Sequence, residues 1–242
     1  MSKLINIQYS VFSNIHIKPS AEIINDMLTE LNKIGEYNFI PNIIIGQNID
    51  IPTGRIVPLN NISYITVDQR IQIACLNERI DVTINNADSS QSDSLFELIV
   101  YARKMLALVM KKNRILSNRL ALNISLLSDT LESSIFESCI GKKYCKTLDF
   151  YLGEQLDEWS TRTNVKKEIK MDQNELLNII TEVSSIIDGA SGKRRFLCHM
   201  DINTIYENNG YRFSWESLEK FDNRIVSIVE EIKQEFDNAD KE

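Results

Sequence analysis

The sequence is poor in the residues that build disulfide scaffolds and metal centres. Its 242 residues include four cysteines and two histidines. Four cysteines are too few to stabilise a chain of this length by disulfides, so we expect Cys75 and Cys198 to be strand residues and the Cys139/Cys145 pair to stay reduced. Neither residue type provides the ligand set of a zinc site. The sequence therefore predicts no metal and no cofactor.

Long apolar runs and loop-forming residues are also scarce. No run approaches the roughly 20 apolar residues of a membrane-spanning helix, and the N-terminus lacks the basic, apolar and small-residue regions of a signal peptide. We therefore expect a cytoplasmic protein with no membrane partner. Four prolines and eight glycines leave no room for a long flexible linker, so any two parts of the chain should be joined compactly.

Basic residues are outnumbered by acidic ones, 27 to 34, which gives a net charge of -7. Residues 1–127 are close to neutral, and the acidic excess falls in residues 128–242. Because binding to nucleic acid depends mainly on lysine and arginine contacts with phosphates, a general nucleic-acid partner is disfavoured.

The stretch from residue 63 to residue 127 predicts the centre of the fold. A two-residue turn at 77–78 places all apolar residues of the two flanking strands on one face. A second turn at 68–69 adds a third strand to that face. The predicted pairs are Ile71 with Ile84, Ile73 with Val82, Cys75 with Ile80, Thr66 with Ile71, Tyr64 with Ile73, and Ile62 with Cys75.

Hydrophobic periodicity and capping residues predict the other elements. A buried helix should begin at Ser92 or Asp93 and end near residue 113. A capping-box-like start at Asp172 and Glu175 predicts another helix, and Ser214 should cap the last one. The predicted helices span residues 19–35, 92–113, 130–139, 172–187 and 214–236, and a basic turn follows at 141–146. The predicted strands span residues 4–12, 39–45 at a sheet edge, 119–126, 148–159, 164–171 and 196–204.

This order of elements predicts an α+β fold with two layers, in which helices pack on one face of a mostly antiparallel sheet. The chain divides into an N-terminal half, 1–127, with the central meander, and a C-terminal half, 128–242, ending in an amphipathic helix. The halves are joined compactly or form one domain. A helix followed by a strand occurs at 92–127 and at 172–204, which suggests a degenerate duplication.

The outward-facing positions of the predicted strands form a candidate binding surface. An open sheet face is usually only solvated, but Ile65 and Val67 within this one favour contact with a protein. The candidate surface consists of Arg70, Arg79, Asp81, Arg119, Asn123, His199, Asp201 and Asn203.

An enzymatic alternative depends on Asp157 and on Glu168-Ile-Lys170. These residues resemble the acidic and E-x-K parts of metal-dependent nucleases, in which two carboxylates hold Mg²⁺ and a lysine stabilises developing charge. The surrounding residues 165–171 are mostly polar, which is typical of an exposed strand. Burial of Glu168 beside Asp157 would favour the nuclease, and exposure would favour a binding protein.

Several short segments carry a resemblance to a known family. They are Arg79-Ile-Asp81, Arg119-Leu-Ala-Leu-Asn123, Asp201-Ile-Asn-Thr204 and Arg212-Phe-Ser-Trp-Glu-Ser-Leu218. With them the chain resembles a sporadically distributed prokaryotic family of uncharacterised proteins of similar length. The resemblance brings no catalytic residues. The patchy distribution of that family implies that its members are encoded on mobile elements, or in defence or toxin and antitoxin loci.

Together, the polar surface and the resemblance predict a non-enzymatic component of a multi-protein bacterial or phage-related system. Its expected partner is another protein, and a homodimer is a further predicted assembly.

Overall fold

The structure is a computed structural model that describes residues 2–35, 37–50, 55–86, 94–134, 137–144 and 159–240. Its strands are β1 (Lys3–Phe12), β2 (Phe39–Asp50), β3 (Arg55–Thr66), β4 (Ile71–Cys75), β5 (Arg79–Asn85), β6 (Arg119–Leu127), β7 (Ser160–Lys170), β8 (Asn174–Ile187) and β9 (Arg194–Thr204). Its helices are α1 (Ala21–Leu31), α2 (Leu95–Lys112), α3 (Cys139–Tyr144) and α4 (Ser217–Ala239).

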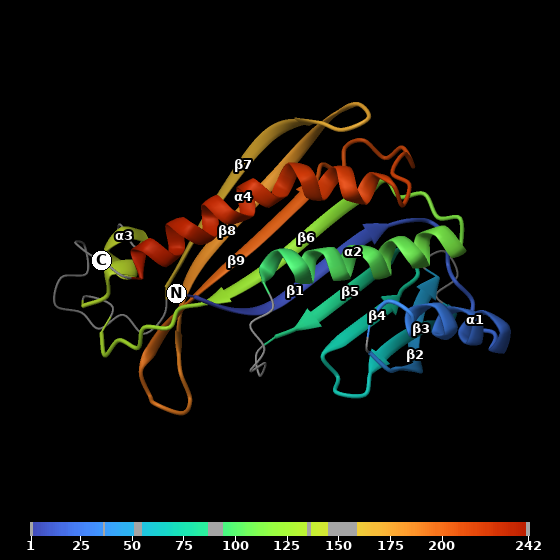
Figure 1. Cartoon of the computed structure of the whole chain (residues 1–242), viewed down its shortest axis with the longest axis horizontal. Helices are drawn as coiled ribbons and strands as arrows, with labels where there is room; N and C mark the ends of the chain where they lie inside the picture. The colour runs from blue at the N-terminus through green and yellow to red at the C-terminus, as the bar shows by residue number, and fades with distance from the viewer. Residues whose placement is uncertain are drawn as a thin grey trace.

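The described strands form one antiparallel sheet in the order β2-β3-β4-β5-β1-β6-β9-β8-β7 (Figure 1). This arrangement confirms the predicted α+β class and the antiparallel sheet. It also places β2 at an edge, as its proline predicted. β6 pairs with β9, so the sheet continues across the predicted boundary between the two halves.

The meander of β3, β4 and β5 has the predicted register. Ile73 pairs with Val82 and with Tyr64, and Cys75 pairs with Ile80 and Ile62. The side chains of all these residues are buried. Because a shift of one residue would turn each of them to the other face, the apolar pattern alone specifies this register.

Two helices cover the apolar side chains of the central strands. α2 packs against β1 and β5, and α4 packs against β6 and β9. Ser94 caps α2 by accepting a hydrogen bond from the backbone of Glu97, whose carboxylate bonds back to Ser94. The cap is therefore later than the predicted Ser92 or Asp93, which lie outside the described residues. Phe96, near the start of α2, is 51% exposed.

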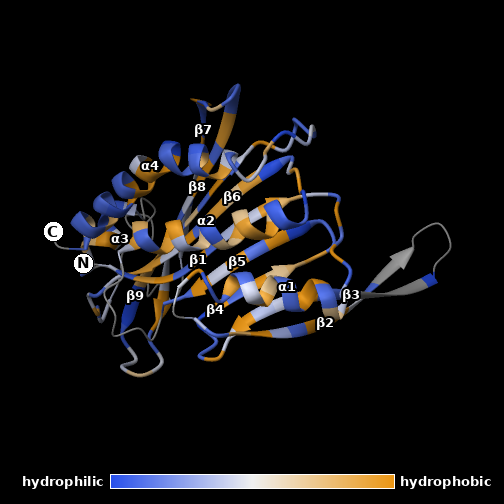
Figure 2. Cartoon of the chain, turned by 45° about the vertical axis from the view of Figure 1, so that its right-hand side comes forward, coloured by the Kyte–Doolittle hydropathy of each residue, from blue (hydrophilic) through white to orange (hydrophobic). Residues whose placement is uncertain are grey.

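The polarity of α4 agrees with this packing. Figure 2 shows mainly hydrophilic colour along its outward side, and its apolar residues include the fully buried Leu218, Phe221 and Ile225. Among the described residues, no helix is both long and apolar enough to span a membrane.

The largest correction concerns residues 172–187, which were predicted to form a helix. Residues 174–187 form the strand β8, paired with both β7 and β9. The apolar spacing of three and four fitted a helix, but this segment is rich in β-branched residues, which favour strands. A helix followed by a strand therefore does not occur at 172–204, and the duplication loses one of its two copies.

The predicted helix at 130–139 is wrong as well. Glu132 forms a backbone bridge with Arg194, and the short helix α3 begins only at Cys139. Part of the predicted basic turn at 141–146 therefore belongs to a helix. The predicted strand at 148–159 lies outside the described residues except for Trp159, which is not in a strand.

Both ends of the last helix also differ from expectation. α4 begins at Ser217 rather than after Ser214, because residue 213 forms a bridge with Ser117 that keeps the preceding chain extended. At its other end, α4 continues past the predicted end at 236 to Ala239. Asp237 in this last part is buried, and it accepts hydrogen bonds from the backbone nitrogen of Ser2 and from Lys233.

Candidate functional site

The residues of the predicted binding surface share one side of the sheet, which we call the polar sheet face. They do so because all of them except Arg70, which stands just before β4, alternate along their strands with buried residues. Cross-strand pairing arranges them with their neighbours in rows. The rows are Arg79, Phe12 and Arg119; Asp81, Ser10, Ala121 and Asn203; Gln8, Asn123 and Asp201; and Ser125 and His199. β1 separates β5 from β6, so Arg79 and Asp81 do not adjoin Arg119 directly.

Two residues of the predicted surface are not available to a partner. Asp81 is only 4% exposed, and its carboxylate accepts from Ser10 Oγ at 2.6 Å and lies 2.9 Å from Arg79 Nε. Asn203 is buried and donates to Asp201 Oδ1 at 2.8 Å. Burial raises the pKa of Asp81, while Ser10 and Arg79 oppose the rise. Both residues were expected to be exposed, but neighbouring side chains cover them.

The remaining predicted residues are half-buried. Arg70 stands before β4 and donates to Asn86 at 3.0 Å. His199 Nδ1 lies 3.1 Å from Ser125 Oγ. These contacts hold the side chains in place within the polar sheet face.

An arginine and aromatic cluster closes one end of the polar sheet face. Phe12, the last residue of β1, lies between Arg79 and Arg119 in the same row. The guanidinium carbons of the two arginines lie 5.9 and 4.8 Å from the centre of the Phe12 ring. Such cation–π contacts fix an arginine without using its hydrogen-bond donors. Among the described residues, the buried Nε of Arg119 has no hydrogen-bond partner.

A pocket of about 260 Å³ adjoins this cluster, and we call it the arginine–tyrosine pocket. Two tyrosines from the loop between β9 and α4 form its outer wall. Tyr206 is 68% exposed and Tyr211 is 42% exposed. The lining residues are Phe12, Ser13, Asn14, Glu78, Asn118, Arg119, Tyr206 and Tyr211.

The loop that carries these tyrosines is held by Arg212. Its guanidinium makes two hydrogen bonds to the carboxylate of Glu175, at 2.8 and 2.7 Å. The same group donates to the backbone oxygens of Asn118, Asn208 and Gly210. Burial works against ionisation of Glu175, but the bonds from Arg212 prevail and its pKa is lowered. The loop therefore has a fixed shape without a helix or strand.

The candidate nuclease residues occupy a different place. Glu168 and Lys170 lie exposed on β7, an edge strand, and Glu168 pairs with Leu176. Asp157 lies outside the described residues. Within the described residues, no group of three histidine, cysteine or acidic side chains is arranged to hold a metal ion.

Sequence reasoning found Arg79 and Arg119 but missed the residues that make a pocket beside them. Tyr206 and Tyr211 lie in a polar loop far along the chain, and the pairing of Ser117 with Phe213 and the bond from Arg212 to Asn118 bring that loop to β6. The sequence signal for the pocket was weak. It consisted of the two tyrosines in Tyr206-Glu-Asn-Asn-Gly-Tyr211, because a polar loop does not need large aromatic side chains for its own structure.

No known protein-family model matches this chain, and no curated protein matches it significantly. The resemblance to the sporadic prokaryotic family stays a prediction.

Proposed function

We propose that this protein binds another protein through the polar sheet face and that the arginine–tyrosine pocket anchors the contact. The observation that carries the proposal is the position of Arg119. Its guanidinium lies over the Phe12 ring in the lining of the pocket, and two exposed tyrosines stand beside it. Arginine and tyrosine are the residues that most often dominate the energy of protein interfaces.

The chemistry of the pocket indicates what it would receive. Phe12 and the tyrosines offer apolar surface, and Arg119 offers a charged donor. A partner side chain with a carboxylate or amide oxygen on an apolar stem would satisfy both. The rest of the polar sheet face would then form a hydrated, hydrogen-bonding surround, as in most interfaces between proteins that also exist alone.

In this role the helices lie on the opposite face of the sheet, so that the polar sheet face is open to a partner. This arrangement is supported by the contacts of α2 and α4 with the strands and by the hydrogen bond from Tyr9 to Asp222 of α4. In this role the protein is a non-enzymatic component of a multi-protein bacterial or phage-related system. A second copy of the chain is the alternative partner.

The test is quantitative capture of partners in the native host with the full-length chain, its Tyr206→Ala variant and its Arg119→Gln variant. We expect at least one captured protein to fall by about tenfold or more in both variants, because loss of an interface anchor typically costs 2 kcal/mol or more. Cross-links from that protein should map to the polar sheet face.

Lys142→Gln is the matched control for the loss of charge. Lys142 is exposed on α3, which packs beside α4 and away from the pocket. If every captured protein is recovered equally from all three variants, the pocket is not the anchor. A chain that dimerises and loses its dimer with Tyr206→Ala would make the partner a second copy.

A further inference from the structure

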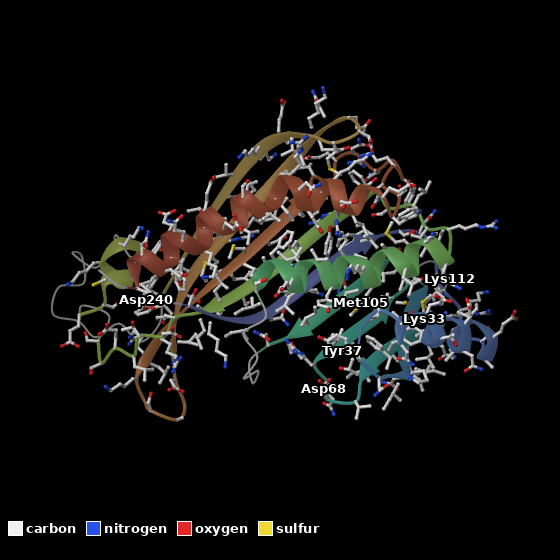
Figure 3. All side chains as sticks on the ribbon, viewed as in Figure 1. Lys33, Tyr37, Asp68, Met105, Lys112 and Asp240 are labelled. Atoms are coloured by element: carbon white, nitrogen blue, oxygen red, sulfur yellow. The ribbon has the colours of Figure 1, made fainter. Side chains whose placement is uncertain are left out.

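A second concave surface lies along α2, and we call it the lysine groove. It has a volume of about 580 Å³ and is bounded by the turn that follows α1, the side of α2 and Trp215. Figure 3 labels Lys33 at the end of α1, which packs against α2. The lining residues are Lys33, Ile34, Gly35, Tyr101, Lys104, Ala107, Leu108, Lys111 and Trp215.

The charge of the groove is opposite to that of the protein. Three lysines line it, and none of the described lining residues is acidic, although the chain has a net charge of -7. Lys33 forms an ion pair with Glu30, with 3.1 Å between Lys33 Nζ and Glu30 Oε1. Lys104 and Lys111 lie instead over the rings of Tyr101 and Trp215, at 5.7 and 5.1 Å from the ring centres. The groove therefore presents positive charge above aromatic walls.

The spacing of the lining residues has the period of a helix. Tyr101, Lys104, Leu108 and Lys111 follow one another at intervals of three and four, so they form one stripe along α2. Lys104 and Lys111 are two turns apart, about 10 Å along the axis. Between them lies a half-buried apolar floor formed by Leu108 and Ala107.

We infer that the lysine groove binds an acidic amphipathic helix of a partner protein. A helix with two acidic residues two turns apart would match Lys104 and Lys111, and its apolar residues between them would cover Leu108. A nucleotide fits less well, because specific binding of a base and a sugar usually uses several convergent hydrogen-bonding groups. The neutral hydrogen-bonding groups of the described lining side chains are the hydroxyl of Tyr101 and the indole N–H of Trp215. This inference stands independently of the polar sheet face.

The experiment uses the full chain and a synthetic helical peptide with two glutamates two turns apart and leucines between them. Trp215 is one of two tryptophans, so a Trp159→Phe background makes its emission a direct report on the groove. We expect saturable binding that weakens as salt is added. The double variant Lys104→Glu, Lys111→Glu should raise the Kd at least tenfold.

The matched control is Lys142→Glu, Lys167→Glu, which reverses two exposed lysines outside the groove. It should change the Kd by less than about twofold, because isolated surface charges contribute little. A peptide with lysines in place of the glutamates should bind the Lys104→Glu, Lys111→Glu variant and not the parent. All four lysines are exposed, and unchanged melting curves would show that the variants fold.

Three results would overturn the inference. One is no binding of the glutamate peptide at millimolar concentration. Another is equal binding by the groove variant and the control variant. The third is quenching of Trp215 by ATP at concentrations where the peptide does nothing, which would make the groove a nucleotide site.

Discussion

Asp81 and Val82 are neighbours on β5 and are both buried, but they face opposite sides of the sheet. Val82 lies among apolar side chains under α2, where no donor or acceptor is needed. Asp81 lies on the polar sheet face, where Ser10 and Arg79 approach one carboxylate oxygen each. The contrast shows that burial alone does not separate the two faces. They differ in whether a buried side chain finds polar partners.

A buried carboxylate of α4 sharpens the contrast. Asp222 of α4 is 2% exposed and accepts a hydrogen bond from Tyr9 at 2.8 Å. Its other oxygen lies 3.4 Å from Arg103 Nε and has no hydrogen bond within the described residues. Burial raises the pKa of Asp222 to about 7, against the effects of Tyr9 and Arg103. A buried carboxylate with an incomplete set of donors is thus costly to ionise.

The largest effect should come from placing a charge on the covered side of β5. Val82→Asp would bury a carboxylate with no partner among Ile73 and the residues of α2, at a cost of several kcal/mol. Urea denaturation should show a strongly destabilised or unfolded chain. Thr83→Asp, the next residue on the polar side, is the control and should cost far less. A Val82→Asp protein that melts like the parent would contradict the register.

The next effect is a dependence of stability on pH. Asp222 is ionised above about pH 7 in the folded protein but above about pH 4 when unfolded, so the folded state binds an extra proton between these values. Its contribution to stability should therefore rise by a few kcal/mol as pH falls from 8 to 4, and be lost as pH rises through 7. Asp222→Asn should remove this contribution.

The measurement compares the free energy of unfolding of the parent, Asp222→Asn and Asp172→Asn across that range. Asp172 is an exposed carboxylate paired with Lys220, and its variant should follow the parent. Parallel curves for parent and Asp222→Asn would show that Asp222 is ionised throughout.

A smaller effect should follow from loosening the loop beside the polar sheet face. Glu175→Gln keeps the size of the side chain but removes the charge that Arg212 pairs with, which leaves the mostly buried guanidinium undercompensated. We expect a loss of about 1–3 kcal/mol in unfolding free energy. Hydrogen exchange of residues 206–211 should rise more than that of β9. Uniform exchange would show that Arg212 does not hold this loop.

The smallest effect is expected at the exposed edge. Glu168→Ala on β7 should change stability by no more than about 0.5 kcal/mol and leave partner capture unchanged, because the side chain is solvated. Lys167→Ala, at the neighbouring exposed position on the same strand, is the control. Divalent-dependent DNA cleavage that disappears with Glu168→Ala would instead support the nuclease with Asp157, Glu168 and Lys170.

The sequence predicted those parts of the fold in which the spacing of apolar residues fits the two-residue period of a strand and does not fit the 3.6-residue period of a helix. In β4 and β5 every second residue is apolar, and a helical reading would scatter Ile71, Ile73 and Ile84 around the axis. In β8 the positions of Leu176, Ile179, Ile180 and Val183 suit a helix. Pairing with strands on both sides decided in favour of a strand, and that information is not local.

The candidate site shows the same limit. Alternation predicted which residues share the polar sheet face, because it depends only on strand geometry. It did not predict that Asp81 and Asn203 would be covered, since cover comes from side chains on neighbouring strands. Nor did it predict the pocket, because Tyr206 and Tyr211 reach Arg119 through a loop whose course depends on Arg212 and Glu175.

The central position of β1 has a consequence for how the chain folds. β1 is the first strand in sequence, yet its neighbours are β5 and β6, and Tyr9 pairs with Val82 and Leu122. During synthesis β1 would remain unpaired until most of the N-terminal half has emerged. Such long-range pairing requires large loops to close. The entropy of loop closure is lost before the new contacts stabilise the structure, which slows folding. Until both neighbours have emerged, the apolar side of β1 stays exposed, and such exposed apolar surface is prone to aggregation.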